Sequence, residues 1–361
     1  MPSSTIAGPA LAALSSLTPN QLIFIKSLPK AELHAHLNGC VPLSVLHQLA
    51  ETYDFSKNLL SREEILSGLQ TLENFSLDDI HSFFGAFRVI YALISTREAL
   101  ATATRAVLAQ FLDDSSNGFP ECTYLELRTT PRPIEMLSAT EYLDTVLKEV
   151  EKYPSNRAAL ILSLDRRMPV NDDEGKGAAI TVGEVIDHAI RLKKEGRRVV
   201  GVDLCGDPLA GDMSLLEPFI TKAQATGLRI TLHIAETTQN SASDTLQLLA
   251  YSPSRLGHAT FLNEEAKEIV LKQSIAVELC LSSNIICKTV PSLSSHHIGY
   301  YLERNHPIAV CTDDTLPFRT SLTAEYALLL ASPPLGLGLS QTEVEKIARN
   351  SLEVAFLRME T

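Results

Sequence analysis

Positive charge is scarce in this sequence. Its 361 residues include 31 lysines and arginines against 43 aspartates and glutamates, which gives a formal net charge of -12. Nucleic acid polymers and anionic membranes are bound through clustered positive charge, so we expect neither as a partner. A small anionic ligand would have to meet a local basic group. Hydrophobic residues make up 45% and charged residues 20% of the chain, which excludes a disordered class and allows a buried core.

The sequence also lacks a disulfide pattern and a long apolar stretch. None of its six cysteines forms a C-x-x-C pair, and most lie in apolar runs, so we expect buried, reduced thiols. No apolar stretch reaches the roughly 18 residues that span a bilayer. The first basic residue is Lys26, so residues 6–14 lack the positive flank of an export signal. We therefore expect a cytoplasmic protein without a membrane span, and from composition we expect residues 1–18 to be poorly ordered.

Eight short apolar runs, each bounded by turn residues, predict strands. Several are apolar nearly throughout, such as AALILSL and RVVGVDL, which is typical of parallel strands covered on both faces. Helical segments fall between most of them, and this alternation predicts an α/β fold, a (β/α)8 TIM barrel, which typically takes about 250 residues. The predicted strands are residues 31–36, 122–127, 158–164, 199–204, 228–234, 254–258, 275–281 and 307–312.

Local signals mark the ends of the helices between these strands. Two pairs of residues have the spacing of a capping box, and two glycines stand where a left-handed stop is expected. An open doubly wound sheet is the rival architecture, but no G-x-G-x-x-G follows any predicted strand. The boxes are Thr181-x-x-Glu184 and Ser340-x-x-Glu343, the stops are Gly196 and Gly227, and the helices are residues 182–195, 214–226, 264–273 and 341–357.

The chain is longer than a minimal barrel, and most of the surplus lies between the first two strands. This stretch predicts helices near residues 43–53, 62–70, 77–93 and 96–112. Because it follows the carboxyl end of a strand, we expect residues 40–120 to form a helical insertion, or lid, over the active-site face. No linker or repeat marks a second domain, so we expect residues 1–361 to form one domain.

Polar side chains interrupt the apolar runs at four strand ends. His34 and His36 point to the same side of the first strand because strand side chains alternate. In a barrel the carboxyl ends of the strands meet at one face, so these histidines should lie near the other polar ends. Imidazoles and a carboxylate suit zinc or a similar divalent ion, which lowers the pKa of a bound water toward about 7 and supports hydrolysis. The other polar ends carry His233, Glu236, His258, Asp313 and Asp314.

Each of these features has a simpler interpretation when taken alone. An isolated H-x-H is often a pair of core histidines, Glu236 could be a solvated carboxylate, and Asp313-Asp314 could cap a helix. Their coincidence at four strand ends favours a metal site. The pair His296-His297 could form a second metal site, but we interpret it as part of a polar loop or a helix cap.

The motifs LHAHLNG, LHIAE, LGHAT and CTDD, in this order, resemble the adenosine/AMP deaminase superfamily along residues 28–356. Three features resemble its adenosine deaminase-like branch, which acts on N6-methyl-AMP: Asn38, the stretch LELRTTPR at residues 125–132, and Asp165-Arg166-Arg167. The resemblance implies hydrolysis of the C6 amine of a purine nucleoside monophosphate, with N6-methyl-AMP and water giving IMP and methylamine. It also implies one zinc ion per chain. We expect the protein to be a monomer.

Site residues follow from the same resemblance. It implies zinc binding by His34, His36, His233 and Asp313, and catalysis by Glu236, His258 and Asp314. Glu236 would protonate purine N1, His258 would orient or deprotonate the water, and Asp314 would hold the hydroxide and a ring nitrogen. The sequence departs from the family at Tyr91, where a histidine that contacts the substrate is usual. The expected substrate contacts are His36, Asn38, Tyr91, Thr129, Thr130, Pro131, Arg132, Asp165, Gly206 and Asp314.

A basic group near a strand end agrees with a phosphate ligand. An acidic protein needs hydroxyl and guanidinium donors for a phosphate, and Thr129, Thr130 and Arg132 supply both. The alternatives are deamination of adenosine or AMP, a binuclear amidohydrolase, and a barrel without catalytic activity. The binuclear class usually needs a bridging carboxylate or modified lysine at a middle strand, whereas strand four is followed by Gly206-Asp207-Pro208.

Overall fold

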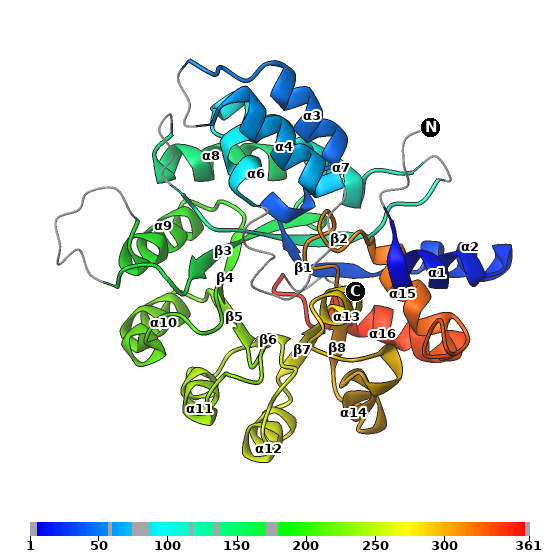
Figure 1. Ribbon diagram of the computed structural model, residues 1–361. Helices are drawn as coiled ribbons and strands as arrows, with labels where there is room; N and C mark the ends of the chain where they lie inside the picture. Colours follow the sequence, from blue (N-terminus) through cyan, green and yellow to red (C-terminus); the bar gives the residue numbers. More distant parts are fainter. Residues whose placement is uncertain are drawn as a thin grey trace.

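The computed structural model describes residues 6–56, 60–73, 87–115, 118–132, 137–170 and 180–357. Eight parallel strands follow one another around a ring in sequence order, with helices on the outside (Figure 1). A parallel bridge between Ala35 and Asp313 brings the last strand back to the first. The predicted TIM barrel is confirmed. The strands are β1 Ala31–His36, β2 Tyr124–Thr129, β3 Ala158–Asp165, β4 Val199–Cys205, β5 Arg229–Ile234, β6 Arg255–His258, β7 Ala276–Leu279 and β8 Ile308–Val310.

The helices outside the ring pack apolar faces on the strands, and this contact forms the main hydrophobic core. Both predicted capping boxes are formed, at the starts of α9 and α16, and Gly196 and Gly227 have φ of 75° and 78°. The helices after β2 are α8 Ala139–Val150, α9 Val182–Lys194, α10 Glu217–Ala225, α11 Ala242–Ala250, α12 Glu264–Gln273, α13 Leu281–Ile286, α14 Ile298–Glu303, α15 Leu322–Leu330 and α16 Gln341–Glu353, with the 3-10 turns η2 Met213–Leu216 and η3 Leu293–Ser295.

The seventh and eighth strands are three residues shorter than predicted, the fifth and sixth are one residue shorter, and the second begins and ends two residues later. The seventh ends at Leu279 because Cys280 already caps the helix α13, and the eighth ends at Val310, just before the bridge at Asp313. The expectation of a poorly ordered beginning was wrong for residues 6–18. These residues include the helix α1 Gly8–Ser16, whose Ala10 and Ala13 are buried, and α1 packs against α15. A capping box at Thr18 and Gln21 starts the next helix, α2 Pro19–Ser27.

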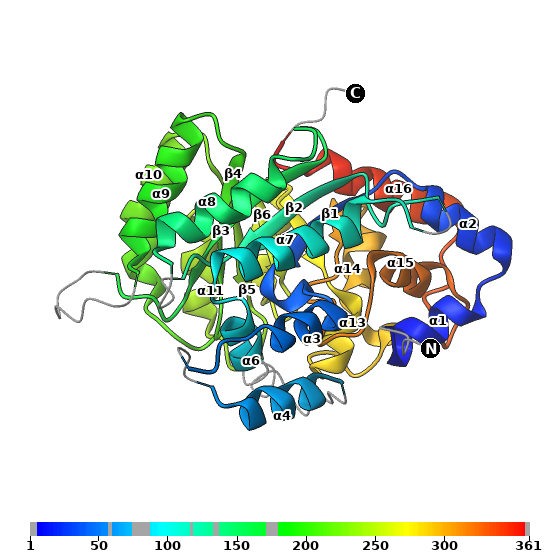
Figure 2. The same ribbon diagram turned by 90° about the horizontal axis from the view of Figure 1, so that it is seen from above.

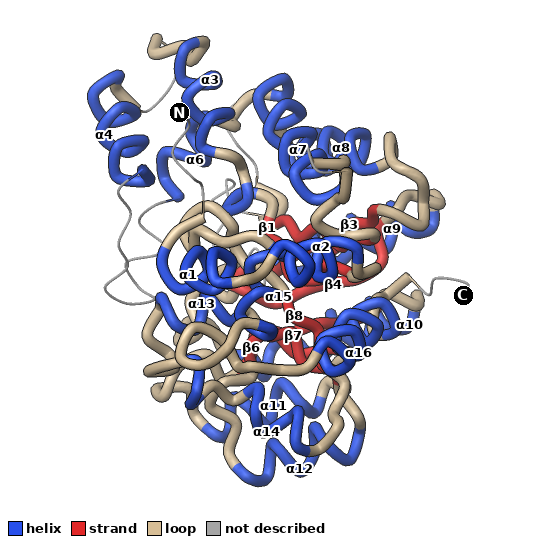
Figure 3. The backbone as a smooth tube through the Cα atoms, turned by 90° about the vertical axis from the view of Figure 1, so that its right-hand side faces the viewer, coloured by secondary structure: helices blue, strands red, loops and turns tan. Residues whose placement is uncertain are grey.

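Helices also occupy the long segment between β1 and β2. They are α3 Leu43–Glu51, α4 Arg62–Glu73, α6 Phe87–Leu93 and α7 Arg97–Leu112, preceded by the 3-10 turn η1 Asn38–Cys40. The first part of the predicted helix 77–93, residues 77–86, lies outside the described residues. Figure 2 and Figure 3 both show α3, α4 and α6 grouped on the side of the barrel away from α16. Among the described residues, no helix combines the length and the apolar character needed to cross a bilayer.

Candidate active site

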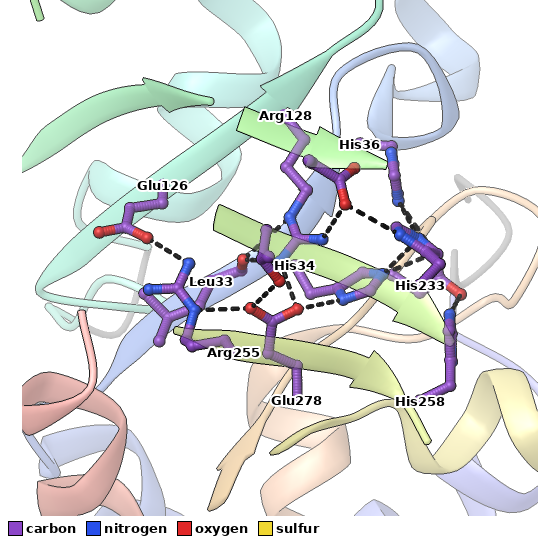
Figure 4. Close-up of polar contacts among 12 residues, drawn as sticks. Leu33, His34, His36, Glu126, Arg128, His233, Arg255, His258 and Glu278 are labelled. Atoms are coloured by element: carbon purple, nitrogen blue, oxygen red, sulfur yellow. Dashed lines mark hydrogen bonds and ion pairs between the residues drawn. The ribbon is translucent and has the colours of Figure 1, made fainter. Parts of the chain in front are cut away.

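Three histidines from two strand ends converge inside the mouth of the barrel (Figure 4). His34 and His36 come from β1 and His233 from β5. The Nε2 atom of His233 lies 3.0 Å from that of His34 and 3.2 Å from that of His36. One ligand atom from each histidine falls within 4.8 Å of the other two, so the three side chains could hold a metal ion together.

Carboxylates behind two of these histidines fix which nitrogen faces the centre. Nδ1 of His34 lies 2.7 Å from Glu278 Oε2, and Nδ1 of His233 lies 3.0 Å from Asp203 Oδ1. When Nδ1–H donates to these oxygens, both Nε2 atoms present lone pairs to each other at 3.0 Å. Such a pair must share a cation, either a proton or a metal ion. A histidine that donates its second nitrogen to a carboxylate is also the usual form of a metal ligand.

Charge around the two carboxylates agrees with this arrangement. Burial alone would raise the pKa of Glu278, but Arg128 and Arg255 hold it at about 2. Burial lowers the pKa of His36 to about 3, with His233 adding to the effect. Burial also opposes protonation of His233, yet Asp203 raises its pKa to about 9. A metal ion bound at Nε2 of His233 therefore competes with a proton, and its affinity should rise with pH.

Asp313 joins the histidines from the end of the last strand. Its Oδ1 lies 3.7 Å from His36 Nε2 and 3.9 Å from His34 Nε2, and its Oδ2 accepts a hydrogen bond of 2.8 Å from Ser283. Asp313 has φ of 62° and His258 has φ of 60°, in the left-handed region that non-glycine residues rarely adopt. Backbone strain of this kind is typical of functional sites, where the surrounding fold holds a side chain in place.

Glu236 and His258 lie beside this cluster. Nε2 of His258 is 3.6 Å from Glu236 Oε1 and 3.8 Å from Asp313 Oδ2. Glu236 is buried, and its Oε1 meets no hydrogen-bond donor among the described residues. Burial raises the pKa of Glu236 to about 7, so this carboxyl can carry a proton near neutral pH. Glu236 therefore has the chemistry of a general acid.

Asp314 presents a second carboxylate with an unpartnered oxygen atom. Its Oδ1 is buried and has no hydrogen-bond partner among the described residues, and burial together with Asp313 raises its pKa. Gly39 lies directly against it, because a Cβ at Gly39 would stand 1.7 Å from Asp314 Oδ1. A buried polar atom without a partner is costly unless a ligand supplies one.

These groups line one pocket, which encloses about 910 Å³ of empty space including its opening. Three of its lining residues, His36, His233 and Asp313, form with the buried His34 what we call the metal-type cluster. The rest of the lining comes from the strand ends and from α6. Thirteen of the predicted site residues line it: His36, Asn38, Tyr91, Thr129, Thr130, Arg132, Asp165, Gly206, His233, Glu236, His258, Asp313 and Asp314. His34 lies behind this lining, fully buried, and Pro131 is buried next to Thr130 without lining the pocket.

Arg132 is held between two other lining residues. Its Nη2 lies 3.6 Å from Asp165 Oδ2, and its Cζ lies 4.4 Å from the centre of the Tyr91 ring. Its Nε is buried without a hydrogen-bond partner among the described residues. Gly206, with φ of 95°, packs so closely that a Cβ there would stand 2.7 Å from Asp165 Oδ1. Arg132 is thus a positioned cation in the pocket lining, where its guanidinium can meet an anion.

Sequence reasoning missed the charged residues inside the barrel. Arg128, Asp203, Arg255 and Glu278 are fully buried, and they support the histidines from behind. A single charged residue within an apolar strand, as in IAVELCL, was the available signal. Such a charge is almost never fully buried unless it is paired.

The pair His296-His297 supports the pocket in another way. Nδ1 of His296 accepts from the backbone N–H of Ile298, so its Nε2 donates to Asn284 Oδ1 at 3.1 Å. Nε2 of His297 donates to the backbone oxygen of His258 at 2.8 Å. Each ring makes a structural hydrogen bond, and Nδ1 of His297 is buried without a partner among the described residues. His297 is also the N-cap residue of α14, so the pair agrees with the interpretation as a polar loop or a helix cap.

A TIM barrel whose strand ends gather three histidines, an aspartate and a protonatable glutamate defines a class of hydrolytic barrel with a metal-type site. The family model for adenosine deaminase matches residues 29–361. The chain belongs to the adenosine deaminase family, and it is a hydrolytic deaminase.

Individual relatives match over nearly their full length. An adenosine deaminase-like protein of Drosophila melanogaster is 34% identical, with 87% of this chain and 88% of the relative covered. The human N6-methyl-AMP deaminase is 31% identical, with 94% of this chain and 91% of the relative covered. The crystal structure of the Arabidopsis N6-mAMP deaminase superposes with a TM-score of 0.79 at 31% identity, covering 93% of this chain and 95% of that one.

Proposed function

We propose that the protein hydrolyses N6-methyl-AMP to IMP and methylamine with the help of one zinc ion. The observation that carries this proposal is the pocket itself. Its lining combines residues of the metal-type cluster, two carboxylates that each have an unpartnered oxygen, and the positioned guanidinium of Arg132. A purine base with a 5′-phosphate presents matching groups, namely ring nitrogens and an anion.

Relatives support the choice of substrate. Three proteins that are 30–32% identical to this chain, from Danio rerio, Bos taurus and Homo sapiens, carry the name N6-methyl-AMP deaminase. Solved structures of an Arabidopsis relative, at 31% identity, contain IMP or GMP. Both are purine nucleoside monophosphates, and IMP is the product that we propose here.

Zinc fits the donors that the chain provides. Imidazole nitrogens and one carboxylate are ligands that zinc prefers, and the lone pairs of His34 and His233 face each other. His36 and Asp313 would complete the set. When bound, the ion would act as a Lewis acid and lower the pKa of a water molecule.

The protein's own groups would carry the proton transfers. Glu236, protonated near neutral pH, would donate to N1 of the purine and make C6 electrophilic. His258, beside Glu236 and Asp313, would orient the attacking water and accept its proton. Asp314 would accept a hydrogen bond from the attacking oxygen or from a ring nitrogen. The C6–N6 bond then breaks as N6 takes the proton that His258 had accepted from the water, so methylamine leaves as a neutral amine. The second proton of the water passes to the Glu236 carboxylate, and N1 of IMP keeps the proton that Glu236 donated.

The remaining contacts would hold the rest of the nucleotide. We assign the base to the backbone of Gly206, and the sugar to Asn38 and Asp165. The phosphate would meet Arg132, the hydroxyls of Thr129 and Thr130, and the loop at Pro131. Tyr91 would act through Arg132, on which its ring is stacked. The helices of residues 40–120 would form a wall of this pocket within a single domain of residues 1–361.

Two further parts of the proposal concern the protein in solution. We propose a cytoplasmic monomer, and the six buried free cysteines are compatible with a reducing compartment. Light scattering on purified protein measures the mass, and fluorescence microscopy of a tagged chain reports the compartment.

The decisive experiment compares N6-methyl-AMP, AMP and adenosine at equal concentration. Products are separated by chromatography, and zinc is measured on the same sample. We expect IMP and methylamine, the highest kcat/KM for N6-methyl-AMP, and one zinc per chain. If kcat/KM is higher for AMP or for adenosine, that compound becomes the assigned substrate. Two metal ions per chain would favour a binuclear site. Absence of turnover would favour a barrel without catalytic activity.

A further inference from the structure

Arg128 occupies the interior of the barrel and reaches two other strands. It belongs to β2, its side chain is fully buried, and its guanidinium lies between Asp203 of β4 and Glu278 of β7. Figure 4 shows this guanidinium beside His34 and Glu278. A buried arginine is expensive unless every charge and donor is matched, so its contacts are informative.

The contacts of Arg128 use the same oxygen atoms that orient the histidines. Its Nη1 lies 3.2 Å from Asp203 Oδ1, which also accepts from His233 Nδ1. Its Nη2 contacts Glu278 Oε2, which also accepts from His34 Nδ1. One rigid fork therefore ties together the two carboxylates that orient His34 and His233.

The backbone holds this fork in place. Nε and Nη2 of Arg128 donate to the carbonyl oxygen of Leu33, at 3.1 Å and 2.8 Å. Leu33 directly precedes His34, so the guanidinium is anchored to the strand that carries two of the histidines. A planar guanidinium with five donors can satisfy these acceptors together, whereas a lysine ammonium cannot reproduce the same fork.

Arg255 offers an internal comparison. It is equally buried and also contacts Glu278, but through the other oxygen, Oε1, at 2.6 Å. Its second carboxylate partner is Glu126, at 2.6 Å. Arg255 thus supports Glu278 without touching either oxygen that faces a histidine, and it has no contact with Asp203.

We propose that Arg128 is a positioning residue of the metal site, which sets the orientation of His34 and His233 through the shared oxygens of Glu278 and Asp203. The effect should be unequal on the two sides. Without Arg128, Glu278 keeps Arg255 and the hydroxyl of Thr231 in addition to His34. Among the described residues, Asp203 would keep only the neutral hydroxyl of Ser163 in addition to His233 itself. His233 is therefore the ligand that depends more strongly on Arg128.

Zinc affinity of the purified protein tests this inference, which rests on the proposed zinc site. Arg128→Lys and Arg255→Lys form a matched pair, because each keeps a buried positive charge and loses one guanidinium fork. Competition with a chelator gives the zinc Kd without any nucleotide present. We expect Arg128→Lys to weaken zinc binding by about 10-fold to 100-fold, the usual effect of losing an outer partner of a metal ligand, and Arg255→Lys to change it less than about threefold.

Two further variants separate positioning from general destabilisation. Asp203→Asn should reproduce the loss of zinc affinity, and Asp203→Asn combined with Arg128→Lys should lose little more than either alone, because both act on His233. Ser163→Ala, which removes a partner of the other Asp203 oxygen, should leave the zinc Kd nearly unchanged. Asp203→Asn and Ser163→Ala both keep Arg128, so these two variants test the His233 side even if Arg128→Lys folds poorly.

The outcomes distinguish this inference from the proposed function. If the wild-type protein binds no zinc, the proposed metal fails. If the wild-type protein binds zinc and Arg128→Lys has the same zinc Kd, the positioning role of Arg128 is wrong. It is also wrong if Arg255→Lys loses as much zinc affinity as Arg128→Lys. The absorption spectrum of cobalt-substituted protein adds a readout of ligand geometry, which should change in Arg128→Lys and remain that of the wild type in Arg255→Lys.

Discussion

The Nε2 atoms of His34 and His233 face each other at 3.0 Å, although each histidine belongs to a different strand and each has its Nδ1 beside a carboxylate. Two imidazoles rarely approach in this way unless a cation lies between them, because lone pairs repel. The contact therefore links the buried charges of the barrel interior to the chemistry at its mouth. It also explains why a barrel interior, usually filled by branched apolar side chains, here contains paired charges.

Glu236→Gln should separate metal binding from turnover. The amide keeps the shape of the side chain but cannot give a proton to the purine ring, so we expect kcat to fall by roughly 100-fold to 10,000-fold. Glu236 is not among the proposed ligands, so zinc content should stay at the wild-type value. Steady-state kinetics with N6-methyl-AMP and metal analysis on the same preparation check both parts. Near wild-type turnover would remove Glu236 from its assigned role.

Arg132→Ala should affect only substrates with a phosphate. We expect kcat/KM for N6-methyl-AMP to fall by about 10-fold or more, since a charged partner of the phosphate is lost, while the value for N6-methyladenosine changes little. Arg167→Ala is the matched control, because Arg167 is an exposed arginine paired with Asp207 and does not line the pocket. Equal losses for both substrates, or equal effects of both variants, would argue against a phosphate site at Arg132.

Much of the fold could be predicted because the strands are apolar and the helix starts carry capping boxes. The ends of the strands were less predictable. Cys280 continues the apolar run of β7, yet its backbone caps α13. Hydrophobicity alone does not distinguish a residue at the end of a strand from one at the start of a helix. The helix α1 was missed because burial of Ala10 and Ala13 depends on α15, which lies about 300 residues further along the chain.

The candidate site could likewise be predicted only in part. His34 and His36 could be placed on one side from the alternation of a strand, and the other polar strand ends from the geometry of a barrel. The partners behind them could not be predicted. That Glu278 meets His34, and Asp203 meets His233, depends on how strands close across the ring, and sequence spacing carries no such information.

Gly39→Ala should disable the pocket without unfolding the protein. The new Cβ would stand 1.7 Å from Asp314 Oδ1, so the carboxylate must move away from its present position. A displacement of about 1 Å at a reacting group can cost about 100-fold in rate, and we expect a loss of that order in kcat/KM. Gly299→Ala is the control, since nothing lies within 4 Å of its Cβ and it belongs to the helix α14. Unchanged activity in Gly39→Ala would show that Asp314 is free to move without consequence.

Glu325 should make the stability of the fold depend on pH. It is fully buried on α15, accepts hydrogen bonds from the backbone of Ser282 and the hydroxyl of Thr320, and burial raises its pKa to about 7. Between an unfolded pKa near 4.5 and the folded value, the folded chain holds a proton that the unfolded chain has lost, so this group lowers stability as pH rises through that window. Glu325→Gln removes the ionisable group, and we expect it to be more stable than the wild type at pH 8 by about 3 kcal/mol, with a much smaller difference at pH 5. Urea unfolding of both proteins at the two pH values measures the change, and a difference that does not grow between pH 5 and pH 8 would contradict the raised pKa.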